Sequence, residues 1–377
     1  MNHIAIFGCG QLAQMTAQAG IKLGLRFSFI ADTGEDTRCV NSLGNIVISE
    51  SGQSAVDLFN ALGQPDIITV EKEMVDAELL KALKKLTMVY PCNDSIKIAQ
   101  NRIREKNYIR ECGIPTADFE VVTSKEQLTG LAESFGFPIY IKAAESGYDG
   151  YHQWRLKSYA DIEQSGLLDA INNGVSLIAE KHVPYHREVS VIAARSADGS
   201  VVSYPLMENR HEEGVLIATI PPAPELESAL EAQAFDFMSR VLTKMDYVGV
   251  LTMECFETDK GIVVNELAPR VHNSGHWTIE GSATSQFENH CRAIADMPLG
   301  ETGVKNMMGL VNMLGKYGNS EDFTSAHYFY HDYGKSERAR RKLGHVTMCA
   351  SSLEELYAAL NKTLLALYGD QYLPYDA

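Results

Sequence analysis

Two glutamates in a short hairpin-like segment are the residues best placed to do chemistry in this sequence. The segment GVLTMECFETDKGIVVNELA, residues 249–268, reads as two apolar strands joined by a tight turn, yet it carries Glu254 and Glu266. Residues 259–261, with glycine last, predict a three-residue loop made of a type I turn and a left-handed residue. Such a loop sets Glu254 directly opposite Glu266, so both carboxylates share one face of the sheet.

Facing carboxylates repel each other, and burial strengthens the repulsion. Nearby cations relieve it, and Mg²⁺ in particular is commonly held by one or two carboxylates together with substrate phosphates. The pair therefore predicts a site for Mg²⁺ or Mn²⁺, to which the neighbouring Asn265 could add an amide oxygen. The alternative is a register slipped by one residue, which would turn one of the two glutamates towards solvent.

The tail that follows the second strand, PRVHNSGH at 269–276, supplies groups that bind anions. Arg270 can grip an oxyanion with two parallel hydrogen bonds. Asn273, Ser274 and the backbone N–H groups around Gly275 can bind a second anion. A metal-binding pair followed by an anion-binding tail favours phosphoryl transfer.

A glycine-containing turn earlier in the chain could cover phosphates. ESGYDGYHQ, residues 145–153, places two glycines between two predicted strands, where backbone N–H groups can bind an anion. Lys142 lies on the strand before this flap and Arg102 on an earlier helix, and both could neutralise nucleotide phosphates. Taken alone, a lysine on a strand such as Lys142 is usually an ordinary surface charge.

The segment AEKHVPYHREVSV, residues 179–191, is a candidate hinge for a nucleotide base. Glu180 and Lys181 stand at the end of a predicted strand, where an adenine could contact backbone groups. Glu188 could bind the ribose hydroxyls.

The N-terminal motif GCGQLA, residues 8–13, opens a second possibility. It matches GxGxxA after a predicted strand, and Asp32 ends the next strand, about where a dinucleotide fold places a ribose-binding acid. A nicotinamide-dependent oxidoreductase is therefore an alternative. However, a helix N-terminus favours any phosphate, and Gln11 places a polar side chain inside this loop.

The elements that position these residues fall into two patterns. In the first hundred residues, apolar strands alternate with amphipathic helices, which predicts a parallel sheet with helices on both faces. Further along, one helical stretch at 95–113 precedes a series of strand candidates and a long helix at 224–245. A mixed α/β tail begins near residue 301. We expect an N-terminal domain at 1–100, a central domain at 101–300 with a flap subdomain at about 115–185, and a C-terminal domain at 301–377.

Composition narrows the class of protein. The chain has 377 residues and a formal net charge of −16, which argues against non-specific binding to nucleic acid or to an anionic membrane. Seven scattered cysteines, no apolar run long enough to span a membrane and no signal-peptide pattern predict a soluble cytoplasmic protein. The late basic segment GKSERARRKLGH, residues 334–345, is either a solvated helix face or an anion-binding cluster.

Taken together, these motifs resemble the N5-carboxyaminoimidazole ribonucleotide synthetase family of the ATP-grasp superfamily, the ATP-dependent subunit of phosphoribosylaminoimidazole carboxylase. The longest motif, and one highly specific for this family, is NELAPRVHNSGHWTIEGSATSQFENH. GCGQLAQM, GYDG, ENRHEEGVL and YGKSERARRKLGHVT occur in the expected order, so the resemblance covers most of the chain. It implies an ATP-grasp architecture with a Rossmann-like N-terminal domain, a small glycine-flap domain and a C-terminal mixed α/β region.

The resemblance also implies a reaction and its residues. ATP would phosphorylate bicarbonate to carboxyphosphate, which would carboxylate the amine of 5-aminoimidazole ribonucleotide. The ATP-binding residues would be Arg102, Lys142, Gly147, Gly150, Gln153, Glu180, Lys181, Val183, Glu188, His211 and Asn265, with Mg²⁺ on Glu254 and Glu266. The catalytic group would be Tyr148, Asp149, Arg270 and Asn273. The substrate phosphate and ribose would contact Gly10, Gln11, Leu12, Lys335, Arg338, Arg341 and Lys342. A homodimer and a companion mutase that takes the product are implied as partners.

The sequence departs from the family pattern in the flap. The family usually has GYDGKGQ, whereas Tyr151 and His152 stand here in place of Lys and Gly. Asn101 precedes Arg102 where Asp is usual, and Cys9 stands where glycine is common. Another ATP-grasp ligase acting on a different amine, and a non-catalytic ATP-binding relative, are therefore the alternatives.

Overall fold

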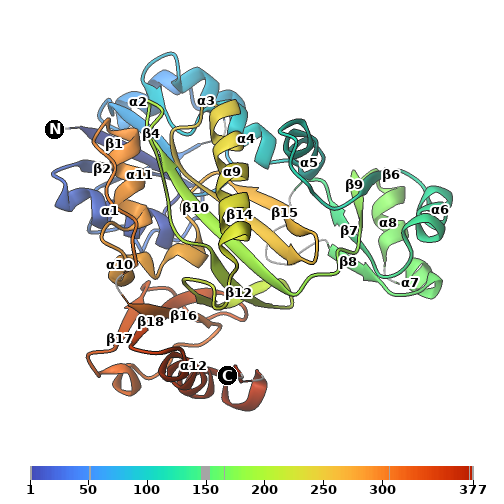
Figure 1. Ribbon diagram of the computed structural model, residues 1–377. Coiled ribbons are helices and arrows are strands. Elements are labelled where there is room, and N and C mark those ends of the chain that lie inside the picture. Colours follow the sequence, from blue (N-terminus) through green and yellow to red (C-terminus); the bar gives the residue numbers. More distant parts are fainter. Residues whose placement is uncertain are drawn as a thin grey trace.

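The computed structural model describes residues 2–50, 52–145, 153–164, 166–304, 306–372 and 374–375, and it contains three sheets (Figure 1). The N-terminal sheet has the order β3-β2-β1-β4-β5, and all its strands are parallel. The predicted parallel sheet is confirmed. Its strands are β1 (His3–Phe7), β2 (Arg26–Asp32), β3 (Asn45–Ser49), β4 (Ile67–Val70) and β5 (Met88–Val89), and its helices are α1 (Gln11–Lys22), α2 (Ala55–Ala61) and α3 (Ala77–Leu83).

The single helical stretch predicted at 95–113 is wrong, because two helices occupy this region. They are α4 (Asn93–Ala99) and α5 (Arg102–Glu111). Asn101 has an extended backbone between them, and its side chain accepts hydrogen bonds from the N–H groups of Ile103 and Arg104. Asparagine is a preferred N-cap residue. The break places Arg102 in the first turn of α5.

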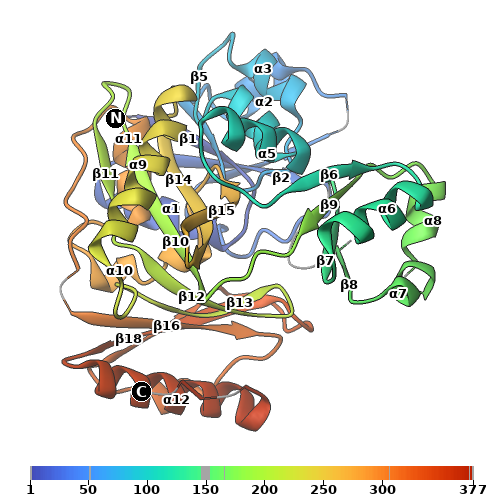
Figure 2. The same cartoon turned by 45° about the vertical axis from the view of Figure 1, so that its right-hand side comes forward.

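A small antiparallel sheet projects to one side of the molecule (Figures 1 and 2). Its order is β6-β9-β7-β8, and it has its own apolar core. β7 and β8 pair as an antiparallel hairpin on either side of the flap, as predicted. The elements are β6 (Phe119–Val122), β7 (Ile139–Ala143), β8 (Gln153–Leu156), β9 (Leu177–Lys181), α6 (Lys125–Phe135), α7 (Tyr159–Gln164) and α8 (Leu167–Asn172).

The large sheet runs through the centre of the molecule and continues into the C-terminal region. Its order is β15-β14-β10-β12-β13-β16-β18-β17, with β11 paired to β10. Strand β13 pairs with β16 from beyond residue 301, so one sheet crosses the domain boundary expected there. The strands are β10 (Arg187–Arg195), β11 (Val201–Ser203), β12 (Met207–Glu212), β13 (Val215–Ile220), β14 (Gly249–Thr258), β15 (Gly261–Ala268), β16 (Met307–Leu314), β17 (Tyr328–Asp332) and β18 (Lys342–Ala350).

Helices cover the large sheet along its length. Helix α12 lies against β16 and β18 at the lower end in Figure 2, and α11 packs on β10 and β14. The remaining helices are α9 (Ser228–Lys244), α10 (Thr278–Gly281), α11 (Gln286–Ile294) and α12 (Leu353–Tyr368), with single 3₁₀ turns at Asn273–Gly275, Ser320–Phe323 and Gly369–Gln371. No helix in the described part of the chain is both long enough and apolar enough to cross a membrane.

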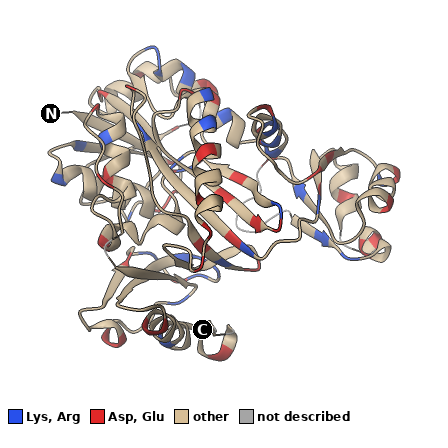
Figure 3. Ribbon diagram, viewed as in Figure 1, with Lys and Arg blue, Asp and Glu red and all other residues tan. Residues whose placement is uncertain are grey.

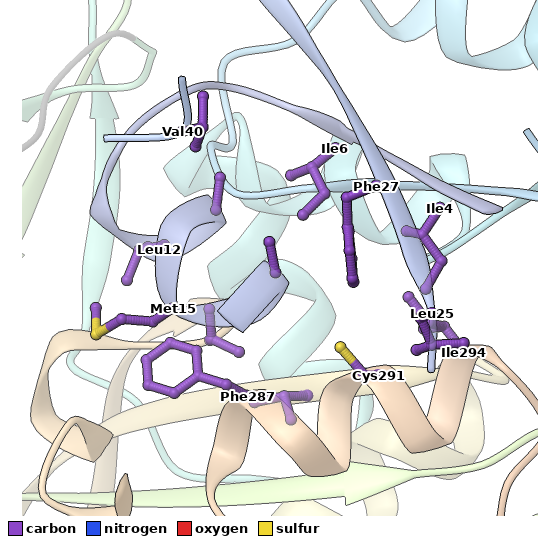
Figure 4. Packing of buried hydrophobic residues seen from close by; sticks show 14 of the residues in the cluster. Ile4, Ile6, Leu12, Met15, Leu25, Phe27, Val40, Phe287, Cys291 and Ile294 are labelled. Atoms are coloured by element: carbon purple, nitrogen blue, oxygen red, sulfur yellow. The ribbon is translucent and has the colours of Figure 1, made fainter. Parts of the chain in front are cut away.

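An apolar seam fixes the N-terminal sheet on the large sheet. Leu12 and Met15 of α1 belong to the same buried cluster as Phe287, Cys291 and Ile294 of α11, and Met15 lies on the side of Phe287 (Figure 4). Because α1 begins at Gln11, this packing sets the glycine loop at 8–10 in a fixed place relative to the β14–β15 hairpin.

Candidate active site

The β14–β15 hairpin sets Glu254 opposite Glu266, as predicted, but by a different route. Thr258 pairs with Gly261, so the loop has two residues rather than three. That loop alone would place Glu254 opposite Asn265. A β-bulge between Glu254 and Cys255 leaves Asn265 as an extra residue and restores the Glu254–Glu266 pair. The predicted facing pair is confirmed, the predicted loop is wrong, and the slipped register is excluded.

The two carboxylates have opposite electrostatic environments. Burial opposes ionisation of Glu254, but the hydrogen bond from His272, together with the charges of His211 and Lys342, lowers its pKa to about 2. Burial and the charge of Glu254 raise the pKa of Glu266, against the opposing charges of Lys142 and Arg102. Acidic residues mark this hairpin in Figure 3.

A divalent cation fits this pair of residues. The oxygen donors suit Mg²⁺, and a cation beside them would remove the repulsion that raises the pKa of Glu266. Among the residues that the structure describes, no group of three or more His, Cys, Asp and Glu side chains could hold a metal. Two protein carboxylates completed by substrate phosphates are a usual arrangement for Mg²⁺.

A chain of buried hydrogen bonds fixes the proton of His272. The backbone N–H of Ser274 donates to His272 Nδ1 over 3.3 Å, so Nε2 carries the proton and donates to Glu254 Oε1 over 3.0 Å. The Ser274 hydroxyl therefore also donates to Nδ1, at 2.9 Å, and accepts from Ser190 at 3.1 Å. Asn209 Nδ2 donates to Ser190 Oγ at 2.7 Å. Because Nδ1 accepts both bonds, the imidazole that holds Glu254 is neutral, and burial lowers the pKa of His272 in the same direction.

The anion-binding tail lies in the same place. Arg270 Nη2 forms an ion pair with Glu73 Oε1 at 2.9 Å. Asn273 is 6% exposed, and both polar atoms of its side chain are buried with no hydrogen-bond partner among the described residues. Because buried polar groups are normally hydrogen-bonded, an orphaned amide at a cavity wall indicates a ligand-binding position.

The predicted nucleotide ligands are mostly paired with one another. Lys142 Nζ lies 2.7 Å from Glu180 Oε2, and His211 Nδ1 lies 2.6 Å from Glu188 Oε2. Arg102 donates to the carbonyl of Ala143. Two further predicted ligands, Lys181 (exposed) and Val183 (half-buried), follow at the end of β9. Gly147, Tyr148, Asp149, Gly150, Tyr151 and His152 lie outside the described residues.

The glycine loop before α1 binds a carboxylate of the protein itself. The N–H groups of Gly10 and Ala13 donate to the Glu71 carboxylate. Burial raises the pKa of Glu71, and these two hydrogen bonds oppose the rise. A Cβ on Gly8 would lie 2.4 Å from Glu71 Cγ. The oxidoreductase alternative is therefore wrong: the glycines make room for Glu71 where a pyrophosphate would bind, and Asp32 pairs with Lys72.

We expect Gly8→Ala to destabilise the protein far more than Gly24→Ala. Both glycines have a positive φ, +111° and +81°, but a Cβ on Gly24 has nothing within 4 Å. Backbone strain alone should lower the free energy of unfolding by about 1–2 kcal/mol in Gly24→Ala. Overlap with Glu71 should add about 1–3 kcal/mol in Gly8→Ala. Equal losses for the two variants in urea unfolding would contradict the contact with Glu71.

The basic segment at 334–341 is a loop between β17 and β18, so the alternative of a helix face is wrong. Lys335 Nζ donates to Gln11 Oε1, which joins this loop to the N-terminal loop. Lys342 lies at the cavity wall. Arg341 forms an ion pair with Asp36 at 2.9 Å, and Arg338 is exposed away from the cavity lining.

One cavity of about 470 Å³ brings together about half of the predicted site residues that the structure describes. Ten predicted site residues line it: Gln11, Leu12, Arg102, Gln153, His211, Glu254, Glu266, Arg270, Asn273 and Lys342. Its wall also includes Glu71, Glu73 and Glu105, which were not predicted. The VEKEM run at the end of a parallel strand was a usable signal for Glu71 and Glu73, since ligands bind at the carboxyl ends of such strands.

The fold and this cavity define an ATP-grasp enzyme. Residues 107–287 match the ATP-grasp domain family, and residues 1–100 match the ribonucleotide synthetase preATP-grasp domain. Residues 309–359 match the phosphoribosylaminoimidazole carboxylase C-terminal domain. The predicted ATP-grasp architecture is confirmed.

Known proteins narrow the class further. N5-carboxyaminoimidazole ribonucleotide synthase from Pseudomonas aeruginosa is 39% identical over 358 residues, 95% of this chain and 97% of that protein. The crystal structure of the synthetase from Thermus thermophilus is 35% identical, with a TM-score of 0.90 and coverage of 99% and 100% of the two chains. The Aspergillus clavatus enzyme, in complex with ADP and 5-aminoimidazole ribonucleotide, is 25% identical, with a TM-score of 0.87 and coverage of 97% and 98%. The chain therefore belongs to the N5-carboxyaminoimidazole ribonucleotide synthase family.

Proposed function

We propose that this protein uses ATP and bicarbonate to carboxylate 5-aminoimidazole ribonucleotide in purine biosynthesis. Bicarbonate attacks the γ-phosphate of ATP to give carboxyphosphate and ADP. The amine of the ribonucleotide then attacks the carboxyl carbon, phosphate leaves, and N5-carboxyaminoimidazole ribonucleotide forms with loss of a proton. The observation that carries the proposal is the single cavity in which a carboxylate pair, the anion-binding groups Arg270 and Asn273, and Gln11 of the N-terminal loop meet.

ATP is proposed to lie between the small sheet and the β14–β15 hairpin. Arg102, Lys142 and the flap cover its phosphates, while the hinge at 180–183 and Glu188 with His211 bind the adenosine. Glu254 and Glu266 hold Mg²⁺, with Asn265 beside the nucleotide. When bound, Mg²⁺ would neutralise charge on the transferred phosphoryl group.

The other two substrates are proposed to bind in the same cavity, next to the nucleotide and towards the N-terminal loop. Arg270 and Asn273 hold bicarbonate and then carboxyphosphate, and Tyr148 and Asp149 approach the amine. The phosphoribosyl group lies between the basic loop and the N-terminal loop, where Lys335 bonds to Gln11. Arg341 is engaged with Asp36, whereas Lys342, at the start of β18, lines the cavity.

The wider setting is proposed from the family. The protein acts in the cytoplasm as a homodimer, with domains near 1–100, 101–300 and 301–377, and it binds neither nucleic acid nor membrane. Its carbamate-type product passes to the mutase that uses it.

A phosphate-release assay with substrates omitted one at a time tests this function. We expect release that needs ATP, Mg²⁺, bicarbonate and 5-aminoimidazole ribonucleotide together. Release with a different amine in place of the ribonucleotide would favour another ATP-grasp ligase. Tight ATP binding without turnover under every substrate combination would identify a non-catalytic relative and overturn the proposal.

A further inference from the structure

Lys106 is a buried lysine whose ammonium group contacts three oxygen atoms. Its side chain, on α5, is 2% exposed. Its Nζ donates to the carbonyl of Asn265 at 2.9 Å and to Thr116 Oγ1 at 3.3 Å, and it lies 3.1 Å from Glu180 Oε1. An ammonium group has three donors and no acceptor, and two hydrogen bonds and one ion pair hold it in this place.

The partners of Lys106 belong to separate parts of the fold. Asn265 is the bulged residue beside Glu266 on the large sheet, and Glu180 is the residue before the last of β9 in the small sheet. Thr116 also donates to the carbonyl of Val264, and this hydrogen bond holds the segment after α5 against β15. Lys106 is therefore held at the junction between the small sheet and the carboxylate pair.

Glu180 is shared between Lys106 and a second lysine. Its Oε2 lies 2.7 Å from Lys142 Nζ, while its Oε1 faces Lys106. Burial opposes ionisation, but the two ammonium groups lower the pKa of Glu180 to about 2, so the carboxylate is charged. Lys142 is 13% exposed against 2% for Lys106, and Lys142 is the one proposed to contact ATP.

A buried carboxylate that loses its only cation is strongly destabilised. If Lys142 alone paired with Glu180, its movement towards nucleotide phosphates would leave such a charge behind. With Lys106 in place, Glu180 keeps a partner, and Lys142 is free to turn. We propose that Lys106 is a positioning residue that neutralises Glu180 when Lys142 binds the nucleotide phosphates, and so sets the affinity for ATP. This inference rests on the proposed role of Lys142.

Lys106→Met tests the inference, because methionine fills similar space without charge. We expect the dissociation constant for ADP and the KM for ATP to rise about tenfold. The KM for 5-aminoimidazole ribonucleotide should stay within about twofold, since no contact of Lys106 reaches the N-terminal loop. Lys97→Met is the matched control: it also removes an ion-paired lysine, 3.1 Å from Glu78, and should bind ADP like the wild type.

A second pair of variants reports on the shared charge. The Glu180→Gln variant leaves the Lys106 ammonium group buried beside a neutral side chain. The melting temperature of this variant should therefore be lower than that of the Lys106→Met/Glu180→Gln double variant. Adding Glu180→Gln to Lys106→Met also frees Lys142, so the double variant should bind ADP more tightly than Lys106→Met alone. Should Lys106→Met be too unstable to purify, Lys106→Gln replaces it with the same expected loss.

Two results would overturn the inference: wild-type ADP affinity in Lys106→Met, or an equal loss of affinity for ATP and for the ribonucleotide. The second would show a purely structural role. ADP binding by calorimetry needs no turnover. If the wild type binds ADP but releases no phosphate in the presence of the ribonucleotide and bicarbonate, the proposed function fails while the test of Lys106 still stands.

Discussion

We expect Glu266→Gln to lower kcat about a hundredfold or more and, at the same time, to raise the melting temperature. Glutamine keeps the shape of the side chain but removes the negative charge that the proposed Mg²⁺ needs opposite Glu254. It also removes a repulsion from the folded state, because Glu254 and burial both raise the pKa of Glu266. Opposite signs for activity and stability are typical of residues kept for function.

The stability gain has a defined pH window. The pKa of Glu266 is higher in the folded protein than in the unfolded chain. Such a carboxyl lowers the free energy of unfolding as the pH rises above its unfolded pKa of about 4.3. Glu266→Gln should therefore match the wild type in acid and exceed it at neutral pH. Asp259→Asn is the matched control, since it neutralises an exposed carboxylate in the turn of the same hairpin. Full activity in Glu266→Gln would refute the metal assignment.

The facing glutamates were predicted from a three-residue loop that the structure does not have. The predicted pair is still correct, because a two-residue loop followed by a one-residue bulge gives the same register at Glu254 and Glu266. The bulge at Asn265 was not recoverable, because it depends on Lys106 and Thr116, which reach β15 from elsewhere in the chain. Local turn patterns carry no information about such contacts.

The N-terminal loop shows the opposite case, in which a correct local pattern led to a wrong ligand. The GCGQLA motif does form a loop whose N–H groups bind an anion. The anion is the Glu71 carboxylate, which a parallel strand brings to the same edge of the sheet. Sequence spacing predicts the donor loop, but only the strand order decides which acceptor fills it.

The place of the C-terminal strands in the large sheet was not predicted from the sequence, again because it depends on contacts between distant segments. Strands β16 and β18 were expected only as part of a mixed tail, yet they extend the large sheet through the pairing of β13 with β16. Long-range antiparallel pairing leaves no signal at either strand alone. The consequence for the site is direct, since this sheet carries Lys342 to the cavity that holds the β14–β15 carboxylates.

We expect Arg270→Met to lower kcat about a hundredfold. Arg270 lies at the cavity wall beside Asn273, whose buried amide has no partner among the described residues. A guanidinium there can bind two oxygens of carboxyphosphate with parallel hydrogen bonds, which methionine cannot. Its partner Glu73 is 28% exposed, so losing the arginine leaves a carboxylate that water can still reach, and the fold should survive.

Arg270→Lys separates charge from geometry at this position. Lysine retains the positive charge but cannot donate two parallel hydrogen bonds. The kcat of Arg270→Lys should therefore lie between those of the wild type and Arg270→Met. The KM for bicarbonate should rise in both variants, whereas ADP affinity should stay at the wild-type value, because the arginine is proposed to hold the oxyacid rather than the nucleotide. A loss of ADP affinity equal to the loss of bicarbonate affinity would instead place Arg270 on the triphosphate, and the division of the cavity into a nucleotide side and an oxyacid side would then be wrong.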